Sequence, residues 1–113
     1  MTAYRRSDIG LILEAKALTD GTATEILSGD NGGLTINEIR LFNSTGAAIV
    51  TTVDIYDGIN AFYLMKSESI VSNTSNVISV VLPLLNGWSL RVTGATDLQV
   101  IVPHFRTTYR DAV

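Results

Sequence analysis

Apolar and polar residues alternate along most of this 113-residue chain with the period of two that is typical of β-strands. The clearest case is the stretch 34–57, where two strand-like runs flank the turn Asn43-Ser44-Thr45-Gly46. The second run has an apolar face and a polar face, made by Ile49, Thr51, Val53 and Ile55 and by Thr52, Asp54 and Tyr56. We therefore expect the stretch to form a hairpin with one buried face, in which the side chain of Asn43 bonds nearby backbone.

Further strand-like runs follow the same pattern, at 9–18, 23–27, 61–66, 77–82, 88–92 and 97–102. The run 9–18 also suits a helix by composition, but its alternation favours a strand. A β-bulge near Asn37 and Glu38 would place Ile36 and Ile39 on the same face. About eight short strands, separated by Gly, Asn and Asp turns, predict an all-β fold, a single antiparallel β-sandwich of the jelly-roll or Ig-like kind.

Chain length predicts one domain over residues 1–113, with an N-terminal arm at 1–8 and a C-terminal arm at 104–113. Proline cannot donate to a β-ladder, so Pro83 and Pro103 are expected to end strands and Pro103 to release the chain from the sheet. Hydrophobic residues make up 46% of the chain and charged residues only 17%, which predicts that some apolar surface is left for a partner.

The net charge of -3 conceals an acidic body with basic ends, where Arg5 and Arg6 precede it and Arg106 and Arg110 follow it. An acidic body argues against nucleic acid as a partner, because phosphate binding needs clustered Lys and Arg. The ends are either solvated tails or arms that lie on an acidic neighbour. No window is long enough to span a membrane and no secretory signal pattern is present, so a protein made soluble in the cytoplasm is expected.

The sequence offers few candidate catalytic or metal-binding residues. The chain has no Cys, which excludes disulfides and thiolate sites, and its single histidine, His104, has no evident catalytic partner. Asp54 and Asp57 are three residues apart, so they point to opposite faces of a strand, with Asp54 on the solvent face and Asp57 opening a turn at Gly58. The sequence therefore predicts no enzyme activity, no metal site and no cofactor.

Several segments resemble the small β-sandwich virion proteins of tailed bacteriophages. They are TI at 35–36, IRLFNSTG at 39–46, VDIYDG at 53–58, VVLPL at 80–84, GWSLRV at 87–92 and DLQVIV at 97–102. In that group a strand ending in Asn and a small-residue turn precedes a strand ending in Asp-Gly, and a Pro-Leu segment leads into Gly-x-x-Leu-x-Val. Its members are head decoration or cement proteins and small neck or tail components, without catalytic residues.

The resemblance implies a capsid decoration protein of the virion, assembled in the host cytoplasm, that binds the major capsid protein or other virion proteins and forms a homo-oligomer. A neck, tail or fibre-associated ring component is the first alternative. A carbohydrate-binding module, which would use Tyr56, Tyr63 and Trp88, is the second. Because Tyr and Arg are enriched at interface hot spots, we expect the arms to carry the contacts, through Tyr4, Arg5, Arg6, Phe105, Arg106, Tyr109 and Arg110.

Overall fold

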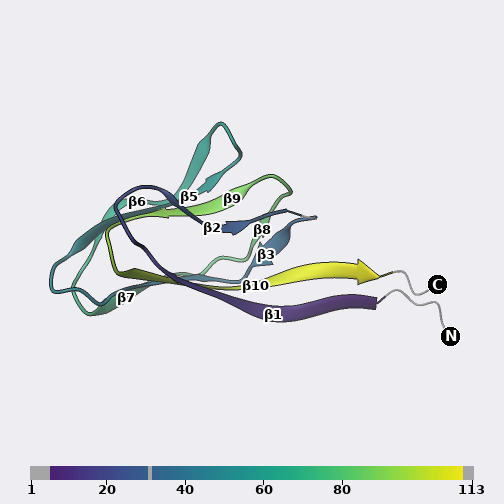
Figure 1. Cartoon of the computed structure of the whole chain (residues 1–113), viewed down its shortest axis with the longest axis horizontal. Coiled ribbons are helices and arrows are strands. Elements are labelled where there is room, and N and C mark those ends of the chain that lie inside the picture. Colours follow the sequence, from purple (N-terminus) through teal and green to yellow (C-terminus); the bar gives the residue numbers. More distant parts are fainter. Residues whose placement is uncertain (1–5, 31, 111–113) are drawn as a thin grey trace.

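The computed structural model describes residues 6–30 and 32–110, and describes side chains for residues 11–30 and 32–106. The described chain is made of strands and turns without a helix, and its strands form two antiparallel sheets that face each other (Figure 1). The strands are β1 (Arg6–Ala17), β2 (Thr24–Ser28), β3 (Leu34–Ile36), β4 (Ile39–Asn43), β5 (Ile49–Tyr56), β6 (Ala61–Ile70), β7 (Thr74–Ile78), β8 (Leu82–Leu84), β9 (Ser89–Thr93) and β10 (Leu98–Arg110). The predicted all-β sandwich is confirmed.

Strand pairing shows which kind of sandwich this is. The larger sheet has the order β7-β4-β10-β3-β8 with β1 on β10, and the smaller sheet has the order β2-β9-β5-β6. Strands also pair from the ends of the chain inward: β1 with β10, β2 with β9, β3 with β8, β4 with β7 and β5 with β6. The chain is thus one long antiparallel hairpin rolled into two facing sheets, which is the jelly-roll arrangement rather than the Ig-like one.

The hairpin expected over residues 34–57 does not form. β4 pairs with β7 and β10 in the larger sheet, whereas β5 pairs with β6 and β9 in the smaller sheet. Each run has one apolar face, and both faces are buried because the two sheets press them against each other. Alternation correctly predicted the buried residues, but it carries no information on which strand lies beside which.

The ladder is interrupted between β3 and β4, at Asn37 and Glu38 as expected, and this places the apolar residues of both strands on the same side of the sheet. Ile36 and Ile39 are both fully buried, although three residues separate them in sequence. The two intervening residues stand outside the ladder, and the amide of Asn37 donates to the Pro103 carbonyl at 2.9 Å.

Asn43 fastens the crossover from β4 to β5. Its amide nitrogen donates to the carbonyls of Ala47 at 2.7 Å and Ile70 at 2.9 Å, and its side-chain oxygen accepts from the amide of Thr45 at 2.9 Å. Every polar atom of this fully buried side chain is paired, as a buried amide requires. The predicted local turn bonding is confirmed, and the bond to Ile70 also ties the crossover to the end of β6.

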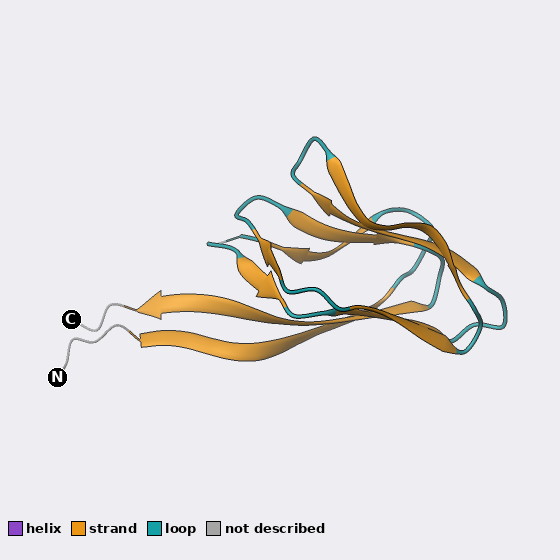
Figure 2. Cartoon of the chain, turned by 180° about the vertical axis from the view of Figure 1, so that it is seen from behind, coloured by secondary structure: helices purple, strands orange, loops and turns teal. Residues whose placement is uncertain are grey.

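The two predicted arms are not separate where they are described. β1 pairs with β10 without interruption from Arg6 opposite Arg110 to Ala17 opposite Gln99, which includes residues 6–8 and 104–110. This two-stranded ribbon projects from the body, and the molecule measures 58 × 29 × 22 Å (Figure 2). The prediction that Pro103 releases the chain from the sheet is therefore wrong.

Pro103 is accommodated because its nitrogen faces a gap. The nitrogen and carbonyl of one strand residue point to the same side, and the Pro103 carbonyl accepts from Asn37, on the side away from β1. On that side β10 pairs with β4 up to Ile101 and with β3 from His104 onward, so no neighbour needs a donor at Pro103.

Candidate interaction surfaces

The outer side of the β1–β10 ribbon carries an uncovered apolar surface. Register places Leu11 opposite Phe105, Leu13 opposite Pro103 and Ala15 opposite Ile101. Opposed residues of antiparallel strands share a face, and the alternate β10 residues Val100, Val102 and His104 are buried in the core. We call this surface the ribbon face; it consists of Leu11, Leu13, Ala15, Ile101, Pro103 and Phe105.

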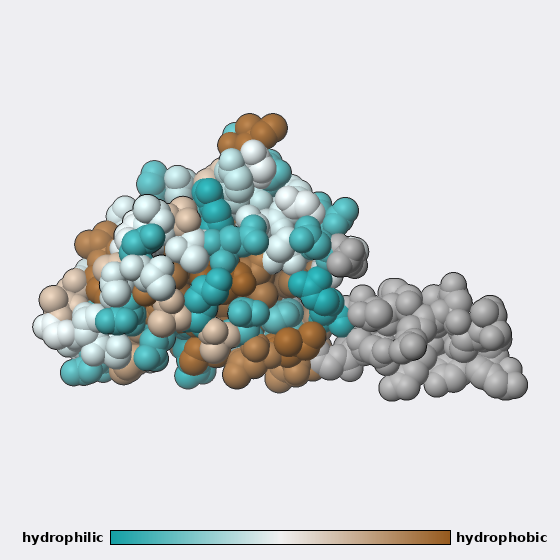
Figure 3. All heavy atoms as spheres, in the orientation of Figure 1, coloured by the Kyte–Doolittle hydropathy of each residue, from teal (hydrophilic) through white to brown (hydrophobic). Residues whose placement is uncertain are grey.

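The ribbon face is exposed because no layer of the fold lies over it. Leu11 is 61% and Leu13 is 64% exposed, and Figure 3 shows hydrophobic residues gathered on the lower surface beside the grey atoms. A shallow hollow of about 230 Å³ extends the surface along Ala15, Ala17 and Ile101. Contiguous apolar surface of this kind is typical of an interaction site.

The interface residues predicted from the sequence fall into three groups. Tyr4 and Arg5 lie outside the described residues. Arg6, Tyr109 and Arg110 lie in the outer part of the ribbon, where Arg6 pairs with Arg110 and Ser7 with Tyr109, and only their backbone is described. Phe105 and Arg106 are described in full, and Phe105 belongs to the ribbon face.

Arg106 binds its own chain. Its guanidinium donates to the carbonyl of Asp30 at 2.9 Å and to the carbonyl of Ser28 at 3.0 Å. The two bonds tie the ribbon to the end of β2, so Arg106 holds the ribbon to the body.

Sequence reasoning missed Leu11 and Leu13 as surface residues. Their signal was the shared strand face of Leu11, Leu13 and Ala15, which predicted a strand but did not show what covers that face. The alternation is real, but the apolar side of β1 points away from the opposite layer of the sandwich.

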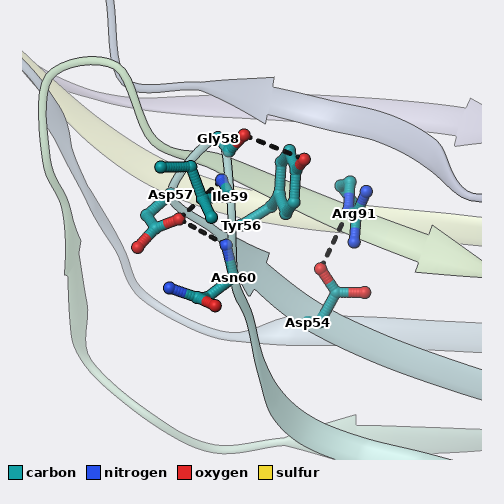
Figure 4. Close-up of polar contacts among 7 residues, drawn as sticks. All are labelled: Asp54, Tyr56, Asp57, Gly58, Ile59, Asn60 and Arg91. Carbon is teal, nitrogen blue, oxygen red and sulfur yellow. Dashed lines mark hydrogen bonds and ion pairs between the residues drawn. The ribbon is translucent and has the colours of Figure 1, made fainter.

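The outer side of the smaller sheet holds a partly buried ion pair (Figure 4). Nε of Arg91 donates to the Asp54 carboxylate at 2.9 Å, and the Arg91 guanidinium lies 3.8 Å from the centre of the Tyr56 ring. The Asp54 side chain is only 4% exposed, so the expectation of a solvent-facing Asp54 is wrong. Asp54 is on the outer side of its strand, as the alternation predicted, but Arg91 from β9 is drawn over it by opposite charge.

The β5–β6 turn forms a second projecting feature. The Asp57 carboxylate accepts from the amides of Asn60 at 2.6 Å and Ile59 at 2.8 Å, and these bonds hold the pKa of Asp57 below its usual value. Gly58 has a φ of 104°, which a side chain would disfavour, and Ile59 at the tip is 84% exposed. The prediction that Asp57 opens a turn at Gly58 is confirmed.

Aromatic residues near this turn do not share one platform. Trp88 is partly buried against the core and stacks on Phe62 with ring centres 5.8 Å apart. Tyr63 lies opposite Asp54 on the outer side of the smaller sheet, and Lys66 lies 4.7 Å from its ring centre.

Within the described side chains, no group of three or more His, Cys, Asp or Glu residues is placed to hold a metal ion. His104 is buried, and its Nδ1 lies 3.1 Å from the Val102 carbonyl. The described residues also include no helix that is long and apolar enough to cross a membrane.

This chain is similar in fold to chains of solved structures. A chain of infectious bursal disease virus, Gx strain, matches 95% of this chain at 12% identity with a TM-score of 0.50. A chain of the T13 IBDV viral particle matches with the same coverage, identity and TM-score. This chain spans 32% and 35% of those two chains, about a third of their length.

A chain of the cyanophage Pam1 capsid asymmetric unit matches 89% of this chain and 84% of its own length, at 12% identity and a TM-score of 0.38. No protein-family model matches the sequence. No curated protein matches it either.

Proposed function

We propose that this protein is a structural component of a virus particle and has no enzyme activity. Three observations support the proposal: the jelly-roll strand order, the fold shared with chains of viral particles, and an apolar surface that its own fold leaves open. Jelly rolls recur in the domains of viral capsids.

The ribbon face carries the more specific proposal, that the protein is a decoration protein on the outer surface of the major capsid protein. Leu11 and Leu13 stand out from a strand that is paired along its whole length, so they can be buried with little loss of backbone entropy. Each Å² of apolar surface removed from water contributes roughly 25 cal/mol. Contact with two neighbouring capsid subunits would bind them together and help the shell resist internal pressure.

The test is co-sedimentation of the full chain with empty heads built from the major capsid protein of the same virus. Leu13→Asp and Phe105→Ala should each weaken binding at least about tenfold, because each removes apolar contact from the ribbon face. Val81→Asp is the matched control, since Val81 is exposed but lies outside that face. Circular dichroism checks that each variant is folded. Full binding by both ribbon-face variants, or no binding by the native chain, would contradict the proposal.

A neck or tail component with the same fold would differ in copy number, so a ring of six or twelve subunits in the particle would favour it over a decoration protein. The carbohydrate-binding alternative is weakened by Tyr56 and Tyr63, because Arg91 and Lys66 already lie over these rings. Sugars bind aromatic side chains through the same ring faces.

A further inference from the structure

The edges of the two sheets are protected differently. Edge strands with unpaired backbone invite pairing with another chain, and proteins block them with short length, proline, bulges or charge. β8 has three residues including Pro83, β2 has a register shift between Glu25 and Leu27, and β6 has two register shifts and Ser67 at a φ of 53°. β7 has five residues and begins with polar ones.

β1 lacks the first three of these devices, and its charged residues, Arg6, Asp8, Glu14 and Lys16, lie outside its central apolar run. It is the longest edge strand, with 12 residues, no proline and no register shift in its pairing to β10. Its centre is the apolar run Ile9-Gly10-Leu11-Ile12-Leu13. A long, regular, apolar edge is a surface for β-pairing.

The backbone groups that β1 offers can be identified. The Pro103 carbonyl points away from β1, so Leu13 and Pro103 are a pair without hydrogen bonds between them. The amide and carbonyl of Leu13 therefore point to the open edge, as do those of Leu11 and Ala15, while Ile12 bonds toward β10. The open edge thus presents the backbone of the same residues whose side chains form the ribbon face.

We propose that β1 pairs antiparallel with β1 of a second copy, about a two-fold axis at Ile12. In this register Leu11 stands opposite Leu13 of the second copy, Ile12 opposite its own equivalent, and Asp8 opposite Lys16. The contacts of Leu11 with Leu13 and of Asp8 with Lys16 each occur twice, and the contact between the two Ile12 residues lies on the axis, as a two-fold interface requires. The two larger sheets become one continuous sheet, and the two ribbon faces merge on the same side of it.

Charge selects this register over its neighbours. Because strand side chains alternate, the two ribbon faces lie on the same side of the joined sheet only if paired residues are both odd-numbered or both even-numbered. The neighbouring registers that meet this condition are centred at Leu11 and at Leu13. A centre at Leu11 sets Asp8 against Glu14 and Arg6 against Lys16, which are like charges. A centre at Leu13 sets Ile12 against Glu14 and leaves Lys16 opposite Gly10. Of these three centres, the one at Ile12 combines opposed charges with opposed apolar residues.

Because the chain has no cysteine, a single introduced one reports the register. At the proposed centre the two Ile12 residues form a pair without hydrogen bonds, with Cα atoms about 4.5 Å apart, which suits a disulfide. Ile12→Cys should yield a covalent dimer on mild oxidation of the full chain, whereas the exposed control Val81→Cys should stay monomeric on a non-reducing gel. No covalent dimer from Ile12→Cys would overturn the register.

Charge exchange tests the pairing itself by sedimentation velocity. The native chain should sediment as a dimer of the 12.2 kDa protomer. Lys16→Asp should weaken the dimer about tenfold by opposing like charges twice, and Asp8→Lys combined with Lys16→Asp should restore it. Glu68→Lys, at the exposed edge strand β6, should have no effect.

The inference would be overturned if the native chain stayed monomeric, or if Lys16→Asp left the affinity of the dimer unchanged. The result is independent of the particle role: a dimer that does not bind heads contradicts only the proposed function, and a monomer that binds heads contradicts only the dimer.

Discussion

The body and the β1–β10 ribbon are built from the same kind of strand, yet apolar side chains are buried in the body and exposed on the ribbon. Leu41 in β4 is fully buried between the two sheets, whereas Leu13 in β1 is 64% exposed. Both lie in antiparallel strands with extensive pairing. The difference is the side of the sheet: Leu41 lies opposite Val100 and faces the smaller sheet, whereas Leu13 lies opposite Pro103 on the outer side, which no layer covers.

This contrast separates two sources of order. The body is held by side-chain packing across two layers, which is the main source of stability in a sandwich. The outer ribbon relies on its backbone ladder and on Arg106, and an isolated pair of strands is only marginally stable in water. A region that is regular, apolar and weakly supported is suited to gain its stability from a partner.

The largest expected effect comes from removing the same side chain in each region. Leu41→Ala should lower the free energy of unfolding by about 2–5 kcal/mol, because it leaves a cavity in the core. Leu13→Ala should change it by less than about 0.5 kcal/mol in the monomer, because Leu13 is exposed. Urea denaturation at low protein concentration measures both. Equal losses would show that the ribbon is packed as tightly as the body.

A smaller effect is expected where the ribbon meets the body. Arg106→Ala should cost about 1 kcal/mol, because two bonds to backbone carbonyls are lost at a partly exposed site. Arg106→Lys should not restore the loss, since lysine cannot reach two carbonyls with a planar fork. Hydrogen exchange should accelerate at residues 28–30 and 104–106.

Arg40→Ala is the matched control for Arg106. Arg40 pairs with Glu38 at 3.0 Å on the surface of the larger sheet, and exposed pairs of this kind contribute little. If Arg40→Ala and Arg106→Ala changed exchange at residues 28–30 equally, Arg106 would have no special role in holding the ribbon.

The smallest effect concerns the exposed β5–β6 turn, which is held by polar bonds alone. The amides of Ile59 and Asn60 stabilise the Asp57 carboxylate and lower its pKa. The turn is therefore fully stabilised above the ordinary carboxyl pKa of 3.8 and loses this stabilisation as the pH falls through the lower pKa of the folded state. NMR shifts of both amides should follow this titration, and Asp57→Asn should abolish it.

Asp20 offers an internal comparison for that titration. Its pKa is also lowered, by bonds from the hydroxyl and amide of Thr22. The Thr22 amide should therefore titrate in the same way in Asp57→Asn as in the native chain. A change at Thr22 would mean that the variant had disturbed more than its own turn.

Much of the fold could be predicted from alternation. The buried sets in β4 and β5 were identified, the break at Asn37 and Glu38 was placed, and Asp57 was assigned to its turn. These features are local, because side-chain direction and turn bonding depend on residues a few positions apart. The candidate site was predicted less well. Phe105 does lie on an exposed surface, but Arg106 is bound to its own chain and Leu11 and Leu13 were not recognised.

The sequence by itself therefore determined that this chain forms antiparallel strands with one apolar face each, because the alternation of apolar and polar residues is a property of the sequence. Only the tertiary structure decided that β4 and β5 lie in different sheets, that Asp54 is covered by Arg91, and that the apolar side of β1 points away from the smaller sheet. The physical reason is that alternation specifies which side of a strand avoids water. What covers that side depends on pairings between residues far apart in the chain, and for β1 the described fold supplies no cover.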